Sequence, residues 1–140
     1  MHAKDVMSRA VITVRPHMRV DVAATMITEH GFASAPVVTA EGVLRGMVSV
    51  GDLLRTRPVP DTPNDVDPTT VAEVMTPQPA TVRPGDELVD VAGVLLDRGV
   101  RALPVLDGER LVGIVSRHDV LPHIARRRAA ATATPAAVAS

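Results

Sequence analysis

The fold of this chain is decided by a stretch that occurs twice, as GMVSVGDL at residues 46–53 and as GIVSRHDV at residues 113–120. In both copies a glycine and two apolar residues lead to a serine, and an aspartate follows three residues later. A Ser-x-x-Asp pair after such a run is typical of a strand that ends where a helix begins, because the serine caps the helix and the carboxylate completes a capping box. The sequence therefore predicts the same strand-to-helix junction at two places.

Further matches lie on both sides of this stretch. Val-Met-Ser at residues 6–8 returns as Val-Met-Thr at 74–76, and Thr-Val-Arg-Pro at 13–16 returns at 81–84. These matches are 68 positions apart, whereas the glycine–serine stretches are 67 apart, so one residue has been lost from a turn between them. So many matches at one spacing indicate that the chain is an internal duplication.

Each copy predicts the order strand, helix, strand, strand, helix. Apolar residues at spacings of three and four predict the first helix of each copy; they are Val20, Ala24 and Ile27 in one copy and Leu88, Val91 and Leu95 in the other. The expected strands are residues 11–14, 35–38 and 44–48, with counterparts at 80–82, 103–106 and 111–115. Since one copy is small for an independent core, we expect an α+β fold in which two βαββα repeats pack with pseudo-twofold symmetry.

The boundaries follow from composition. Residues 1–56 form the first repeat, the proline-rich residues 57–68 a connector, and residues 69–126 the second repeat. Thr70 and Glu73 fit a capping box, which predicts a short helix leading into the second repeat. Residues 127–140 have no apolar periodicity, and we expect them to be a disordered tail.

Composition excludes several classes of function. The chain has 140 residues with 15 basic and 16 acidic side chains, so no net field attracts nucleic acid. It has no cysteine, which excludes disulfides, thiolate metal sites and thiol catalysis. No uncharged apolar run is long enough to cross a bilayer, and the histidines and aspartates show no metal-ligand spacing. We expect a cytoplasmic protein without a metal, a membrane segment or an enzymatic activity.

The repeated motifs resemble the cystathionine β-synthase (CBS) domain family, and the pair resembles a Bateman module. The resemblance is carried by Val-Met-Ser/Thr, Thr-Val-Arg-Pro, Ala/Leu-Pro-Val and Gly-x-Val-Ser-x-x-Asp, in this order and twice. It implies clefts between the repeats that bind adenosyl ligands such as AMP, ADP, ATP or S-adenosylmethionine. It also implies a regulatory role beside an effector protein, and a homodimer of modules.

The two Ser-x-x-Asp motifs are the candidates for holding the ribose of such a ligand. A carboxylate can accept hydrogen bonds from both hydroxyls of a ribose diol, and a serine hydroxyl can also reach the sugar. The candidates are Ser49, Asp52, Ser116 and Asp119. The alternative is that these residues only cap helices, and the two roles are compatible.

By the same resemblance, the adenine ring lies between apolar walls and cations contact the phosphates. One site would combine Ile12, Phe32, Ala33 and Ser34 with Ser116 and Asp119. Its counterpart would combine Ala80, Val100, Arg101 and Ala102 with Ser49 and Asp52. The phosphate candidates are Arg101, Arg117 and His118, which makes the two sites chemically unequal. The alternatives are core packing for the apolar residues and solvated surface charge for the cations.

The sequence thus predicts a non-catalytic sensor that takes an adenine nucleotide as its ligand and needs no obligatory cofactor. The competing hypothesis is a dimeric protein-interaction module whose clefts are vestigial. Apolar residues in the helices after Ser49 and Ser116 favour the homodimer under either hypothesis.

Overall fold

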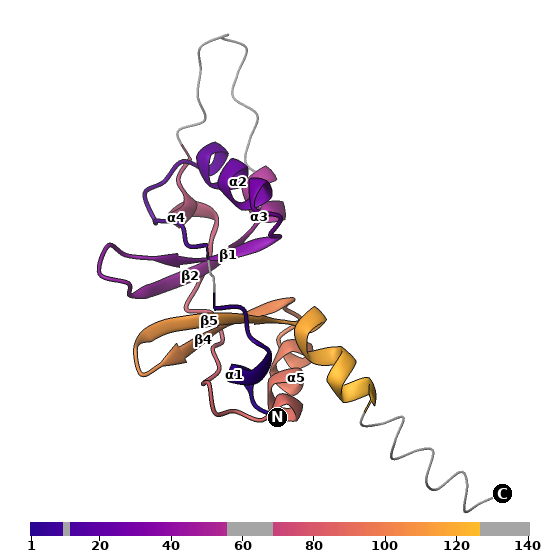
Figure 1. The fold of residues 1–140 in the computed structure, drawn as a ribbon. Helices are drawn as coiled ribbons and strands as arrows, with labels where there is room; N and C mark the ends of the chain where they lie inside the picture. The colour runs from indigo at the N-terminus through magenta and orange to yellow at the C-terminus, as the bar shows by residue number, and fades with distance from the viewer. Residues whose placement is uncertain (10–11, 56–68, 127–140) are drawn as a thin grey trace, which may run out of the picture. The chain divides into compact units, whose positions relative to one another are not determined.

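The computed structural model describes residues 1–9, 12–55 and 69–126 (Figure 1). The predicted connector and tail lie outside the described residues. The described chain forms two compact units. One, called here the N-repeat unit, comprises the described residues 12–55, 69–79 and 108–111. The other, the C-repeat unit, comprises the described residues 1–9, 80–107 and 112–126.

The N-repeat unit is built on a three-stranded antiparallel sheet. Its strands are β1 (Ser34–Val38), β2 (Leu44–Ser49) and β3 (Thr76–Pro77), in the order β1-β2-β3. Its helices are α2 (Val20–Glu29), α3 (Val50–Leu54) and α4 (Val71–Val74). The expected first strand is reduced, over its described part, to one parallel bridge between Val14 and Val37.

The C-repeat unit repeats this plan. Its two-stranded sheet contains β4 (Ala102–Asp107) and β5 (Arg110–Ser116), and Val82 makes the parallel bridge to Val105. Its helices are α1 (Ala3–Val6), α5 (Leu88–Asp97) and a last helix whose described residues are 117–126. The α+β class and the order of elements therefore agree with the prediction.

The apolar stripes of the two long helices form the centres of two separate cores. Leu88, Val91 and Leu95 are all buried, as predicted. In α2, Val20 and Ile27 are buried, but Ala23 is buried in place of the expected Ala24, which lies at the margin of the core. Each helix ends before a glycine with positive φ, Gly31 at 76° and Gly99 at 64°, because this left-handed conformation suits glycine and closes the helix.

The short helices α1 and α4 are exchanged between the repeats. Ala3 of α1 is fully buried in the core that contains Val82 and Leu88, although α1 precedes the first repeat's sheet in the sequence. Val71 of α4 is fully buried in the core that contains Val14 and Val20. Figure 1 shows indigo α1 beside α5 and α4 beside α2. The capping box predicted at Thr70 and Glu73 is present, yet its helix completes the core of the preceding repeat.

One glycine in each unit, Gly113 and Gly46, permits the close approach of the exchanged segment, as Gly113 shows. A β-carbon on Gly113 would lie 2.7 Å from Sδ of Met7 and 2.9 Å from the carbonyl oxygen of Ser8. The amide of Ser8 donates to the carbonyl of Ile114 at 2.8 Å, and the amide of Ile114 donates back at 3.0 Å. Only a residue without a side chain permits the backbone after α1 to lie this close to β5.

Candidate functional site

The first Ser-x-x-Asp motif lies at the junction of β2 and α3, where a β-strand ends in a capped helix. The amide of Ser49 donates to Oδ2 of Asp52 at 2.9 Å, and the amide of Asp52 donates to Oγ of Ser49 at 3.0 Å. These reciprocal bonds are a complete capping box. The predicted alternative, a helix cap, is therefore present.

The second motif has the same geometry at the junction of β5 and the last helix. The amide of Ser116 and its hydroxyl both donate to Oδ2 of Asp119 at 2.9 Å. The amide of Asp119 donates to Oγ of Ser116 at 3.2 Å. Both aspartates are half-buried, so neither is sealed from a ligand.

Each capping box uses one oxygen of its carboxylate. The bonds from Ser49 and Ser116 all end on Oδ2. The second oxygen, Oδ1 of Asp52, faces the guanidinium of Arg55 at 3.9 Å, and the Arg55 side chain is 83% exposed. Within the described ranges Oδ1 of Asp119 has no hydrogen-bond partner. Capping a helix and accepting from a sugar hydroxyl are thus compatible for the same side chain.

The predicted wall of the N-repeat unit lies directly beside its capping motif. Ser34 is opposite Ser49 in the register of β1 and β2, and the amide of Val50 donates to the carbonyl of Ala33 at 2.9 Å. Phe32, the one aromatic residue of the chain, is 40% exposed. Ile12, the remaining member of this wall, is half-buried and lies two residues before the bridge at Val14.

The C-repeat unit gives its wall the same position. The amide of Arg117 donates to the carbonyl of Arg101 at 2.9 Å, which holds the segment before β4 against the start of the last helix. Ala80 and Val100 pack against the margin of the core, so the core-packing alternative applies to both. Ala102 is half-buried at the beginning of β4.

The three candidate cations have different surroundings. The side chains of Arg101 and His118 are exposed and have no hydrogen-bond or ion-pair partner in residues 1–9, 12–55 or 69–126. Arg117 is half-buried, and its guanidinium donates to the carbonyl oxygens of Val100 at 2.8 Å and Leu95 at 3.3 Å. Sequence reasoning missed this contact, because the partners lie 17 and 22 residues away and no local pattern marks them.

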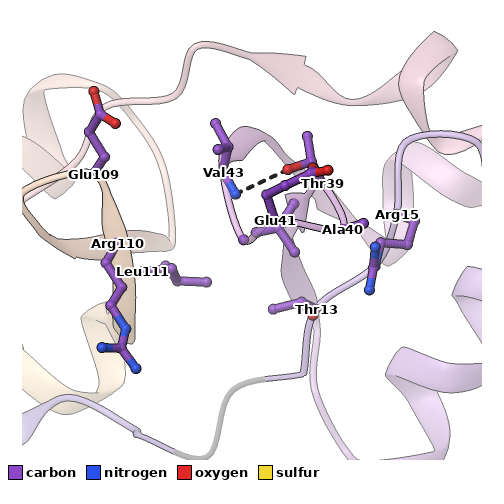
Figure 2. Close-up of a pocket in the computed structure, with 11 residues that line it drawn as sticks. Thr13, Arg15, Thr39, Ala40, Glu41, Val43, Glu109, Arg110 and Leu111 are labelled. Atoms are coloured by element: carbon purple, nitrogen blue, oxygen red, sulfur yellow. Dashed lines mark hydrogen bonds between the residues drawn. The ribbon is translucent and has the colours of Figure 1, made fainter.

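A separate pocket of 570 Å³ lies in the N-repeat unit at the turn of the β1–β2 hairpin (Figure 2). Thr39 closes the turn by accepting from the amide of Val43 at 3.2 Å. The pocket's charged lining residues are Arg15, Glu41, Glu109 and Arg110. The two cations and two carboxylates leave the pocket lining without a net charge. None of the predicted site residues lines this pocket.

Residues 1–9, 12–55 and 69–126 hold no group of three or more metal-ligating side chains. No helix in the same ranges is long and apolar enough to cross a membrane.

The paired βαββα units and their Ser-x-x-Asp junctions define a class of protein. Residues 3–58 and 71–126 both match the CBS domain, so the chain belongs to the CBS domain family and carries a tandem pair, a Bateman module. The resemblance seen in the motifs is thereby confirmed.

Relatives within this family include proteins with bound nucleotides. CBS domain-containing protein YhcV of Bacillus subtilis is 35% identical over 119 residues, which are 84% of this chain and 81% of that protein. The crystal structure of CBSX2 of Arabidopsis thaliana in complex with AMP is 28% identical with a TM-score of 0.75, and covers 91% of this chain and 98% of its own. The cytosolic domain of the Mg²⁺ channel MgtE in complex with ATP is 31% identical with a TM-score of 0.72, covering 86% of this chain and 48% of its own.

Proposed function

We propose that this chain is a non-catalytic regulatory module that binds an adenosyl nucleotide, with Asp52 and Asp119 accepting from the ribose hydroxyls. The proposal rests on one observation: the two oxygens of each aspartate carboxylate have different surroundings. Oδ2 caps a helix in both motifs. Oδ1 of Asp119 has no partner among the described residues, and Oδ1 of Asp52 faces only the exposed side chain of Arg55 at 3.9 Å. Because the cap fixes the rotamer of the aspartate in advance, little conformational entropy is lost when a sugar hydroxyl binds.

The walls support an adenine ring beside this ribose site. Within its own unit, each wall lies next to a motif, Phe32, Ala33 and Ser34 beside that of the N-repeat unit and Val100, Arg101 and Ala102 beside that of the C-repeat unit. The expected pairing of each wall with the motif of the other repeat stays a prediction. Exposed Phe32 offers an aromatic face for stacking. We expect backbone groups of each wall to contact the edge of the base.

The cations support a phosphorylated ligand. Arg101 and His118 flank the wall and the motif of the C-repeat unit, and both are exposed. The corresponding positions of the N-repeat unit are Ala33 and Gly51, which carry no charge. A cationic side chain stabilises a phosphate through charge-assisted hydrogen bonds, so the two motifs should differ in their preference for phosphorylated ligands.

Two relatives lend weight to the ligand class. CBSX2 is 28% identical and was crystallised with AMP, and the MgtE domain is 31% identical and was crystallised with ATP. By analogy, this chain would bind an adenine nucleotide. It would do so in the cytoplasm, where such nucleotides are abundant, and would pass the signal to an effector protein.

The deciding experiment compares ribonucleotides with their 2′-deoxy analogues in thermal-shift and calorimetric titrations. A ligand present at about 100 times its Kd stabilises the folded state by about 2.7 kcal/mol. The 2′-deoxy analogue should stabilise the protein much less, since it leaves a carboxylate oxygen without its partner at a cost of roughly 1–3 kcal/mol. Asp52→Asn and Asp119→Asn should each weaken one site and still fold, because the side-chain oxygen of asparagine can still accept from the amide of the capping serine.

The possible results separate the two hypotheses. Equal shifts with ribo- and deoxyribonucleotides, or wild-type binding by both Asn variants, would mean that the motifs are only helix caps. The chain would then be a dimeric interaction module. Chromatography of AMP and ATP after incubation with the protein tests the non-catalytic part, and conversion of either nucleotide would contradict it.

A further inference from the structure

One cation predicted to contact phosphate has an intramolecular role. Arg117 follows the serine of the second motif, and its Nε donates to the carbonyl of Val100 at 2.8 Å. A terminal nitrogen donates to the carbonyl of Leu95 at 3.3 Å. Leu95 lies in the last turn of α5, and Val100 belongs to the proposed adenine wall. The side chain therefore connects the end of α5, the wall and the start of the last helix.

The backbone around Arg117 strengthens this connection. The amide of Arg117 donates to the carbonyl of Arg101 at 2.9 Å, and the amide of Val100 donates to the carbonyl of Leu95 at 3.1 Å. Two consecutive wall carbonyls, those of Val100 and Arg101, are thus bonded to one residue. Leu95 and Arg117 are at least half-buried, where hydrogen bonds from a cation are less weakened by water.

The N-repeat unit lacks the side-chain part of this arrangement. Its equivalent residue is Val50, whose amide donates to the carbonyl of Ala33 at 2.9 Å in the same way. The amide of Phe32 likewise donates to the carbonyl of Ile27 at 3.1 Å. Valine has no side-chain donor, so within residues 1–9, 12–55 and 69–126 nothing replaces the two guanidinium bonds. In this part of the chain, the wall of the N-repeat unit is held by backbone hydrogen bonds.

From this asymmetry we infer that Arg117 is a positioning residue. It orders the Val100–Arg101 wall before a ligand arrives, so this wall is more preorganised than the wall of the N-repeat unit. The inference deepens the proposed function and rests on it. An ordered wall lowers the entropic cost of binding, and it does so for the adenosine part of the ligand, whatever the number of phosphates. Arg101 and His118, both exposed and without a partner in the described chain, remain the phosphate candidates.

The test measures Kd for adenosine, AMP and ATP by calorimetry with full-length wild type, Arg117→Gln, Arg117→Lys and, as the matched control, Arg101→Gln. Arg117→Gln should weaken all three ligands by a similar factor, about tenfold for the loss of two charge-assisted bonds. Arg117→Lys should also weaken all three, because an ammonium lacks the fork that reaches two carbonyls. Arg101→Gln should weaken AMP and ATP and leave adenosine unchanged.

A second measurement does not depend on ligand binding. Hydrogen exchange of the ligand-free protein should be faster at residues 100–102 in Arg117→Gln than in wild type, and unchanged at residues 32–34. The inference is overturned if Arg117→Gln weakens only AMP and ATP, if Arg117→Lys binds like wild type, or if exchange at 100–102 does not change. A wild-type protein that binds none of the three ligands overturns the proposed function. Hydrogen exchange still decides, in that case, whether Arg117 orders this segment.

Discussion

Gly46 of β2 lies directly against Met75, the residue that links α4 to β3. A β-carbon on Gly46 would come within 2.7 Å of Sδ of Met75 and 2.6 Å of the carbonyl oxygen of Thr76. Gly113 stands in the same relation to Met7 and Ser8. The two motifs that repeat most clearly in the sequence, Val-Met-Ser/Thr and Gly-x-Val-Ser, are therefore in contact in both units.

Gly46→Ala and Gly113→Ala should each destabilise the protein by roughly 1–3 kcal/mol, because the backbone of the neighbouring segment must move. The control is Gly93→Ala in α5, where an added β-carbon meets nothing within 4 Å. That change should stabilise the protein by roughly 0.5–1 kcal/mol, since alanine is the better helix former. Urea denaturation measures all three, and equal effects at the three positions would show that no close approach exists.

Val71→Ala tests the exchange of the short helices. Val71 is fully buried among Val14, Val20 and their neighbours. Removing two methyl groups from such a site should cost roughly 2 kcal/mol. Val22→Ala in α2, where the side chain is 42% exposed, should change the free energy of unfolding by less than about 0.5 kcal/mol. If the two variants unfold at the same urea concentration, α4 is not part of this core.

The cap of α1 predicts a pH dependence. The amide of His2 donates to Oδ2 of Asp5 at 2.7 Å, and this bond lowers the pKa of Asp5 below its ordinary value of 3.8. A carboxyl with a lowered pKa in the folded state adds stability above its unfolded pKa. This contribution is lost as the pH falls through the folded pKa. Asp5→Asn should therefore be less stable than wild type at neutral pH, and the difference should shrink in acid. A difference that stays constant down to the acid transition would contradict the role of the charge.

The homodimer remains a prediction. The exposed apolar residues of the helices after Ser49 and Ser116 are the positions where a substitution can test it. Leu53 and Val120 are buried, but Leu54 is 71% exposed and Leu121 is 39% exposed. We expect light scattering at micromolar concentration to give a mass near twice the 14.7 kDa of one chain. Leu54→Arg should shift the mass toward the monomer, whereas Val43→Arg, at another exposed apolar position, should not. A wild-type mass of one chain would refute the prediction.

The sequence by itself determined the duplication, the fold class and the positions of most elements. Strands predicted at 35–38 and 44–48 are present as β1 and β2, and the stripe of Leu88, Val91 and Leu95 is buried. The Ser-x-x-Asp capping boxes were also predictable. All of these features are local, because the period of a helix and the hydrogen bonds of a cap involve residues at most a few positions apart.

Only the tertiary structure decided which core each short helix completes. Thr70 and Glu73 mark the beginning of α4, but four residues are too few to form a stable helix alone, so packing determines where α4 lies. The same holds for the Arg117 guanidinium, which finds carbonyls 17 and 22 residues away. Contacts of this kind depend on the folded path of the chain, and no spacing in the sequence encodes them. The repeats and the chemical inequality of the two sites could therefore be predicted from the sequence, whereas the exchange of α1 and α4 and the carbonyl contacts of Arg117 could not.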